Sequence, residues 1–101
     1  MSSDLLTQEE LQTVLRKFLD EQGKEFALVA LGYFGSYARQ EAKPDSDVDI
    51  VFETLRPNLF ATMRLHAALS DRFDRPVDLV CLHQYLSLNF RKRIEREAIY
   101  V

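Results

Sequence analysis

Apolar and polar residues recur along the chain with helical and extended periods, and this pattern predicts the order of its elements. Three long stretches carry apolar residues at helical spacing, namely Thr7 to Gln22, Leu59 to Phe73 and Tyr85 to Ala98. Three shorter apolar runs have the length of strands, namely Phe26 to Phe34, Asp47 to Glu53 and Val77 to Leu82. With a short helix after the first strand, this order predicts an α/β (α+β) fold in which helices cover a small mixed sheet.

The first helix has the clearest boundaries. Thr7 and Glu10 have the spacing of a capping box, with Thr7 as N-cap and Glu10 at the third helical position. Gly23 follows the last turn as the expected C-terminal cap. One face of this helix carries the expected core residues Leu11, Val14, Leu15, Phe18 and Leu19.

The remaining elements are predicted from their apolar stripes. The first strand is almost continuously apolar, which predicts burial on both faces, and Gly32 within it marks a bulge or close packing. The stripe of the second long helix is expected at Leu59, Met63, His66, Ser70 and Phe73, widened by Phe60, Ala67 and Leu69. The stripe of the last helix is expected at Leu86, Phe90, Ile94 and Ala98. Residues Ile99 to Val101 could add a short strand.

Two acids open the second strand, after a turn at residues 43–45. Alternate side chains of a strand share one face, so Asp47 and Asp49 point the same way and the apolar residues between and after them point the other way. Carboxylates this close repel each other and resist burial. A divalent cation would offset that charge, and Mg²⁺ is typically held by one or two carboxylates together with substrate phosphates. The alternative is a solvated acid pair at the mouth of the strand.

The pair Gly35–Ser36, at the end of the first strand, favours the metal interpretation. Glycine allows the backbone to come close to a ligand. Ser36 stands where a short helix, expected from Tyr37 to Glu41, can begin, and helix N-termini bind phosphate through their unpaired N–H groups. A phosphate-binding turn and a carboxylate pair in one passage together indicate a nucleotide site.

Asp78, in the apolar run of the third strand, is a further candidate acid. An ionised aspartate is costly to bury alone, so it should have a partner. Taken by itself, it could equally form an ion pair with an arginine such as Arg39, or lie exposed at the beginning of the strand.

The passage from Gly35 to Asp49 reads G-S-x₁₀-D-x-D, and it resembles the signature of the polymerase-beta nucleotidyltransferase superfamily. The strings GSYAR and SDVD are most similar to its minimal nucleotidyltransferase (MNT) branch, as are the element order and the ending Ile94 to Tyr100. One departure is Gln40, where that branch usually has glycine, which puts the turn after the short helix in question. The resemblance implies a polymerase-beta-like fold, and the chain length indicates one domain, residues 1–101.

The resemblance also implies a reaction and its residues. It implies nucleotidyl transfer from ATP to an acceptor hydroxyl with Mg²⁺, as two ions. The implied catalytic and metal-binding residues are Asp47, Asp49 and Asp78, and the implied nucleotide-binding residues are Gly35, Ser36 and Arg39. Asp78 would accept the proton of the hydroxyl or hold the second ion. His66 and His83 lack other metal ligands nearby in sequence and are not expected to be catalytic.

The composition of the chain bears on its partners, its disulfides and its location in the cell. Thirteen basic and 16 acidic residues give a net charge of −3, so no direct nucleic-acid partner is expected. The single cysteine, Cys81, excludes an intrachain disulfide. The chain begins without a basic-then-apolar signal, and no apolar run approaches the roughly 20 residues that cross a membrane. We therefore expect a cytoplasmic protein without membrane contact.

We expect a partner protein to supply the hydroxyl that accepts the nucleotide, because the predicted nucleotidyltransferase domain takes up all the residues and none remain for an acceptor-binding domain. The resemblance implies an antitoxin of the HEPN/MNT type, which adds AMP to a tyrosine of a HEPN-domain RNase toxin within a hetero-oligomer. Two alternatives stay open: a catalytically silent antitoxin that acts by binding alone, and a nucleotidyltransferase that acts on a small molecule. The basic cluster Arg91, Lys92, Arg93 and Arg96 is interpreted as a solvated face, or alternatively as a contact for an acidic partner.

Overall fold

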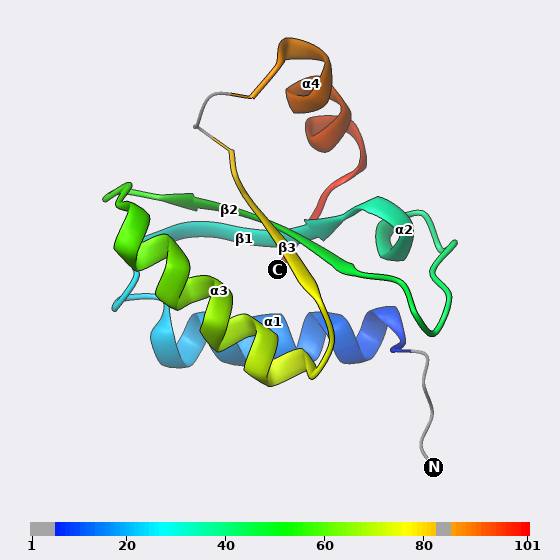
Figure 1. Cartoon of the computed structure of the whole chain (residues 1–101), viewed down its shortest axis with the longest axis horizontal. Helices are drawn as coiled ribbons and strands as arrows, with labels where there is room; N and C mark the ends of the chain where they lie inside the picture. The colour runs from blue at the N-terminus through cyan, green and yellow to red at the C-terminus, as the bar shows by residue number, and fades with distance from the viewer. Residues whose placement is uncertain (1–5, 83–85) are drawn as a thin grey trace.

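The structure is a computed structural model, and it describes residues 6–82 and 86–101. Its elements are α1 (Gln8–Gln22), β1 (Leu28–Phe34), α2 (Gly35–Ala38), β2 (Val48–Thr54), α3 (Leu59–Phe73), β3 (Val77–Cys81), α4 (Leu88–Glu97) and β4 (Ile99–Tyr100). The predicted helices and strands occur in the predicted order, including the short last strand (Figure 1). The predictions made for His83 and Tyr85 lie outside the described residues.

The strands form one mixed sheet in the order β3-β2-β1-β4. β1 is antiparallel to both β2 and β4, whereas β2 and β3 are parallel and are connected through α3. Helices α1 and α3 lie on one face of the sheet, and α4 lies on the other (Figure 1). The predicted fold class, a small mixed sheet covered by helices, is confirmed. Within the described residues, no helix has the length and apolar character needed to cross a lipid bilayer.

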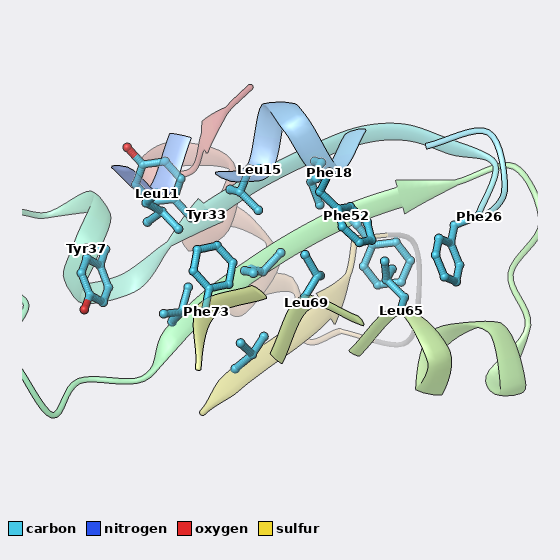
Figure 2. Packing of buried hydrophobic residues seen from close by; sticks show 14 of the residues in the cluster. Leu11, Leu15, Phe18, Phe26, Tyr33, Tyr37, Phe52, Leu65, Leu69 and Phe73 are labelled. Carbon is cyan, nitrogen blue, oxygen red and sulfur yellow. The ribbon is translucent and has the colours of Figure 1, made fainter. Parts of the chain in front are cut away.

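Leucine and aromatic side chains fill the layer between the sheet and the helices α1 and α3 (Figure 2). Every second residue of β2 points into this layer, namely Val48, Ile50 and Phe52. The predicted residues Leu11, Leu15 and Phe18 of α1 are fully buried there. Complete burial of a leucine or phenylalanine side chain contributes about 1.5–3 kcal/mol, so this layer is the main source of stability.

A smaller apolar cluster lies on the opposite face of the sheet, beneath α4. Its buried members are Phe34, Val51, Leu82 and Ile94, and Leu86, Phe90 and Ala98 pack against them. The four residues predicted as the stripe of the last helix therefore all belong to this cluster or pack against it. Leu86, however, lies before α4, which begins at Leu88, and Ala98 is the C-cap. Asp78 faces the same side as this cluster but is exposed, so α4 leaves the face open where β2 and β3 begin.

The two ends of α1 follow the prediction with one difference. The Thr7 hydroxyl accepts the N–H of Glu10 at 3.0 Å, and the Glu10 carboxylate accepts the N–H of Thr7 at 2.9 Å, which completes the capping box. The backbone N–H of Thr7, which the carboxylate accepts, is the largest cause that lowers the pKa of Glu10. Gly23 is the C-cap as predicted, but with a φ of −58° it stays in the right-handed helical region.

β1 differs from its prediction at its beginning. It starts at Leu28, because Ala27 turns the chain there with a φ of 52°. Val29 is 58% exposed, so burial on both faces holds only for the second half of the strand. Gly32 marks close packing, as a Cβ there would lie 2.5 Å from the carbonyl oxygen of Ile99, whereas the bulge occurs earlier in the strand.

Ala27→Gly is expected to stabilise the protein. A residue with a Cβ in the left-handed region lowers the free energy of unfolding by roughly 1–2 kcal/mol, and glycine removes this strain. The greater freedom of glycine in the unfolded chain offsets roughly 0.5–1 kcal/mol of the stability gained. Thermal unfolding should therefore show a Tm higher by a few degrees. Ala30→Gly in β1 is the control, since it adds freedom without relieving a positive φ, and it should lower the Tm. A lower Tm for Ala27→Gly would contradict the expectation.

The buried face of α3 matches the predicted one only in part. The buried residues are Leu65, Leu69 and Phe73, whereas Leu59, Phe60 and Met63 are 73%, 75% and 60% exposed. The stripe at 65, 69 and 73 is entirely apolar, and it buries more nonpolar area than a stripe interrupted by histidine and serine. The prediction was therefore right for Leu69, for Phe73 and for the bounds of the helix. It was wrong for Leu59, Phe60 and Met63, and it did not include Leu65.

Candidate functional site

Asp49 and Asp78 lie side by side on the sheet. They are direct neighbours in the parallel register of β2 and β3. The residues that flank them in both strands pack into the layer of α1 and α3, so alternation places the two carboxylates on the opposite face, beside α4. Asp47 lies just before β2, which begins at Val48, and its side chain is exposed. The structure therefore brings acids from two neighbouring strands together, as expected.

The three carboxylates interact electrostatically. The pKa of Asp49 is raised from its ordinary value of 3.8 to about 6, first because the side chain is partly buried and then because of the negative charge of Asp78. A hydrogen bond with Asp78 and the charge of Asp47 raise this pKa further, whereas the charge of Arg39 lowers it. The site thus has uncompensated negative charge, which is the condition under which a divalent cation is stabilising.

Gly35 brings the start of α2 against Asp49. Its φ is 71°, in the region that favours glycine, and a Cβ at this position would lie 2.0 Å from Oδ2 of Asp49. Only a residue without a side chain allows this approach. Helix α2 begins at Gly35, and Ser36 follows directly, so the expected phosphate-binding turn lies beside the carboxylates.

Helix α2 is shorter than predicted, and its end explains the departure at Gln40. It covers Gly35–Ala38 instead of Tyr37 to Glu41. Gln40 has a φ of 60°, so the chain makes here the left-handed turn for which glycine is favoured. The turn therefore forms without a glycine, but Gln40 lowers the stability of the fold, because a residue with a Cβ is strained in the left-handed region.

Arg39 follows α2 and lies between two glutamates. Its Nε donates to Glu41 at 3.0 Å, and a terminal nitrogen donates to Glu97 at 3.1 Å. Both bonds raise the pKa of Arg39, with the bond to Glu41 as the largest cause. Because its charge also lowers the pKa of Asp49, the guanidinium is within electrostatic range of the carboxylates. The role of Arg39 in nucleotide binding stays a prediction.

Glu97 is a neighbour of the site that sequence reasoning missed. Its Oε1 accepts the backbone N–H of Gly35 at 2.9 Å as well as the bond from Arg39. The pKa of Glu97 is lowered overall: partial burial raises it, but the Gly35 bond and the charges of Arg39 and Arg93 outweigh that effect. The one available signal was its place in the ending Ile94 to Tyr100, which resembles the MNT branch.

The side chain of Tyr37 anchors α2 to the rest of the protein (Figure 2). It is almost fully buried, and its hydroxyl accepts a hydrogen bond at 3.0 Å from Arg75, three residues before Asp78. Gln8 of α1 donates to the carbonyl oxygen of Tyr37. These bonds connect the turn at Ser36 with the segment that leads into β3.

His66 supports the beginning of β3. Its Nε2 lies 2.7 Å from the carbonyl oxygen of Val77, the residue before Asp78. Among the strands that the structure describes, β3 is at the edge of the sheet, so its outward carbonyl groups have no neighbouring strand there. His66 thus has a structural contact at the beginning of β3, and the expectation that it is not catalytic stays a prediction.

The donor set of the site suits a magnesium ion. Asp47, Asp49 and Asp78 offer only carboxylate oxygens, the ligands that Mg²⁺ prefers. Within the described part of the chain, no group of three or more His, Cys, Asp or Glu side chains is arranged to hold a metal ion. That is compatible with a magnesium site whose remaining ligands come from substrate phosphates and water.

A glycine turn beside paired carboxylates on a small mixed sheet defines the class as nucleotidyltransferase, and comparison with known proteins supports this. The family model described as "Polymerase beta, Nucleotidyltransferase" matches residues 6–101, so the chain belongs to the polymerase-beta nucleotidyltransferase family. The chain is 38% identical over 99 residues to the protein adenylyltransferase MntA of Thermococcus cleftensis, covering 96% of this chain and 98% of that protein.

Solved structures agree with this assignment. A candidate minimal nucleotidyltransferase has a TM-score of 0.80 and 30% identity, and the match covers 96% of this chain and 98% of that one. A complex of a tri-AMPylated Shewanella oneidensis HEPN toxin with an MNT antitoxin has a TM-score of 0.58 and 20% identity, covering 91% of this chain and 66% of that one. The latter likeness shows the fold alone. The predicted MNT resemblance and nucleotidyltransferase class are confirmed.

Proposed function

We propose that this protein is an antitoxin that transfers AMP from ATP to a tyrosine of a partner HEPN-domain RNase toxin and so silences it. The observation that carries the proposal is the carboxylate pair beside the Gly35 turn, in a chain similar over nearly its whole length to a protein adenylyltransferase. Asp47 and Asp78 are exposed, so a side chain of another protein can reach them. The partner class is suggested by the AMPylated HEPN toxin that an MNT antitoxin binds.

The proposed reaction exchanges one bond at the α-phosphorus of ATP. The tyrosine oxygen attacks that phosphorus, the bond to the oxygen that leads to the β-phosphate breaks, and pyrophosphate leaves. Asp78 accepts the hydroxyl proton, for which its exposed carboxylate is accessible. Gly35 forms the turn, and Ser36 binds the β- and γ-phosphates through its hydroxyl and through the backbone N–H that follows Gly35. Arg39 adds positive charge beside them.

Asp47, Asp49 and Asp78 would hold Mg²⁺, as a pair of ions shared with the triphosphate. Bound there, the metal would neutralise the charge that develops on the attacking and leaving oxygens. The residues of this chain set its position: β2 and β3 hold Asp49 and Asp78 in register, and Gly35 brings the phosphate turn against Asp49.

The proposal is tested by mixing the protein with Mg²⁺, ATP labelled at the α-phosphate, and the product of a neighbouring HEPN gene. Label should appear on a tyrosine of the toxin, its RNase activity should fall, and EDTA should prevent both. ATP labelled at the γ-phosphate should leave the toxin unlabelled, which distinguishes AMP transfer from phosphorylation. A toxin that binds the protein, is silenced without ATP and never takes up label would overturn the proposal in favour of inhibition by contact alone.

A further inference from the structure

Glu97, the last residue of α4, joins the far helix to the phosphate turn. Its Oε1 accepts the Gly35 N–H at 2.9 Å and an N–H of Arg39 at 3.1 Å, and its Oε2 lies 3.4 Å from the same Arg39 nitrogen. Arg93, one helical turn earlier, adds an ion pair at 3.7 Å. One carboxylate thus contacts both the backbone that begins α2 and the cation that follows it.

This contact is more protected than an ordinary surface ion pair. The Glu97 side chain is 16% exposed, whereas Glu95, which pairs with Arg91 on the same helix, is 53% exposed. Solvent-exposed ion pairs contribute little to stability. A partly buried carboxylate that accepts a backbone N–H forms a stronger, charge-assisted hydrogen bond. Glu97 therefore has a defined position relative to the turn.

The start of α2 needs such an acceptor. The first N–H groups of a helix have no partner within the helix, and the N-cap residue Phe34 provides no side-chain hydrogen bond. Glu97 supplies the acceptor from outside the helix. Gly35 is consequently held on two sides, by Glu97 at its N–H and by the close approach of Asp49 at its Cα.

We propose that Glu97 is a positioning residue for the nucleotide: it fixes the Gly35 turn and directs the Arg39 guanidinium toward the place where the triphosphate binds. The proposal rests on the proposed function, because it concerns the same site. It has one clear rival, in which the Glu97 carboxylate occupies the place of a phosphate and competes with ATP. The two differ in sign, since removal of a positioning residue weakens ATP binding and removal of a competing anion strengthens it.

The test compares Glu97→Ala and Glu97→Gln with wild type, and uses Glu95→Gln as the matched control on the exposed side of α4. KM for ATP and kcat are measured in the labelling assay, and folding is checked by thermal unfolding. When a residue that orients a metal ligand is removed, metal affinity or activity typically falls by about 10–100-fold, and we take the same magnitude for a residue that orients a phosphate-binding turn. We expect Glu97→Ala to raise KM for ATP by about that factor, Glu97→Gln to raise it less because its amide oxygen still accepts the Gly35 N–H, and Glu95→Gln to leave it unchanged.

The outcomes separate this inference from the proposed function. Absence of transfer by the wild-type protein would refute the proposed function. Active wild type with unchanged or lower KM in Glu97→Gln and Glu97→Ala would overturn the positioning role, and a lower KM would favour the competing anion. If Glu97→Ala does not fold, Glu97→Gln decides, because it keeps the shape and the acceptor and removes only the charge.

Discussion

Asp49→Asn is expected to abolish AMP transfer and, in the absence of metal, to make the protein more stable. In the proposed mechanism, the substitution removes a carboxylate that would hold the metal-bound triphosphate, a contribution of several kcal/mol to stabilisation of the transition state. Since each 1.36 kcal/mol is a factor of ten, the rate should fall by about 10³-fold or more. Asp47→Ala should have a similar effect on transfer.

The gain in stability follows from the pKa of Asp49. Its value in the folded protein, about 6, lies above the ordinary value of 3.8, so ionisation of Asp49 favours the unfolded state. The difference corresponds to at most about 3 kcal/mol at 1.36 kcal/mol per pH unit, and solvent screening of this partly exposed group reduces it to about 1–2 kcal/mol. The destabilisation is absent below the ordinary pKa, grows as the pH rises, and is complete above about pH 6. Asparagine carries no charge and avoids it.

Thermal unfolding in EDTA measures this effect. At about 4–8 °C per kcal/mol for a domain of this size, Asp49→Asn should unfold several degrees above wild type at pH 8, and the difference should shrink on acidification toward the ordinary pKa. Glu10 and Glu97, whose pKa values are lowered, stabilise the fold above their unfolded values and lose that effect as the pH falls, but they do so in both proteins. Asp71→Asn, on the exposed side of α3, is the control and should change neither stability nor transfer.

Two observations would contradict this account of Asp49. A variant that unfolds below wild type at pH 8 would mean that the ionised carboxylate is stabilised by a partner other than metal. A variant that still transfers AMP at near the wild-type rate would remove Asp49 from the metal site.

Local rules predicted part of the site. Alternation within the second strand placed Asp49 on the face opposite its apolar neighbours, and the capping box at Thr7 was predictable because both of its partners lie within one helical turn. Asp78 was assigned to the site only through the family resemblance, because its contact with Asp49 joins two strands that are separated by α3.

Glu97 and the orientation of α3 were not predictable from local rules. Glu97 reaches Gly35 across 62 positions of the chain, and only the packing of α4 on the far face of the sheet brings them together. For α3, tertiary packing buries Leu65 beside the predicted Leu69 and Phe73, and it leaves the predicted Leu59 and Met63 exposed. In both cases the deciding contact is nonlocal, so periodicity and capping signals do not contain it.

Gly35→Ala is expected to reduce both transfer and stability, for two separate reasons. At the φ of 71°, a residue with a Cβ is strained, and this lowers the free energy of unfolding by roughly 1–2 kcal/mol. The added Cβ would also lie 2.0 Å from Oδ2 and 2.9 Å from Cγ of Asp49, so the carboxylate must move away from the turn. Since a misplacement of about 1 Å can cost about 10²-fold in rate, transfer should fall by at least about that factor.

The control for Gly35→Ala is Gly23→Ala, which adds the same methyl group at the end of α1. There the Cβ would lie 2.4 Å from the carbonyl oxygen of Leu19, and the φ of −58° is ordinary. Gly23→Ala should therefore lower the Tm while keeping transfer, when both variants are assayed at a temperature at which they are folded. If Gly35→Ala lost only stability and kept its rate, the close approach of the turn to Asp49 would have no part in catalysis. If it lost rate at unchanged KM for ATP, the displaced Asp49 would be responsible, because a damaged phosphate turn would raise KM as well.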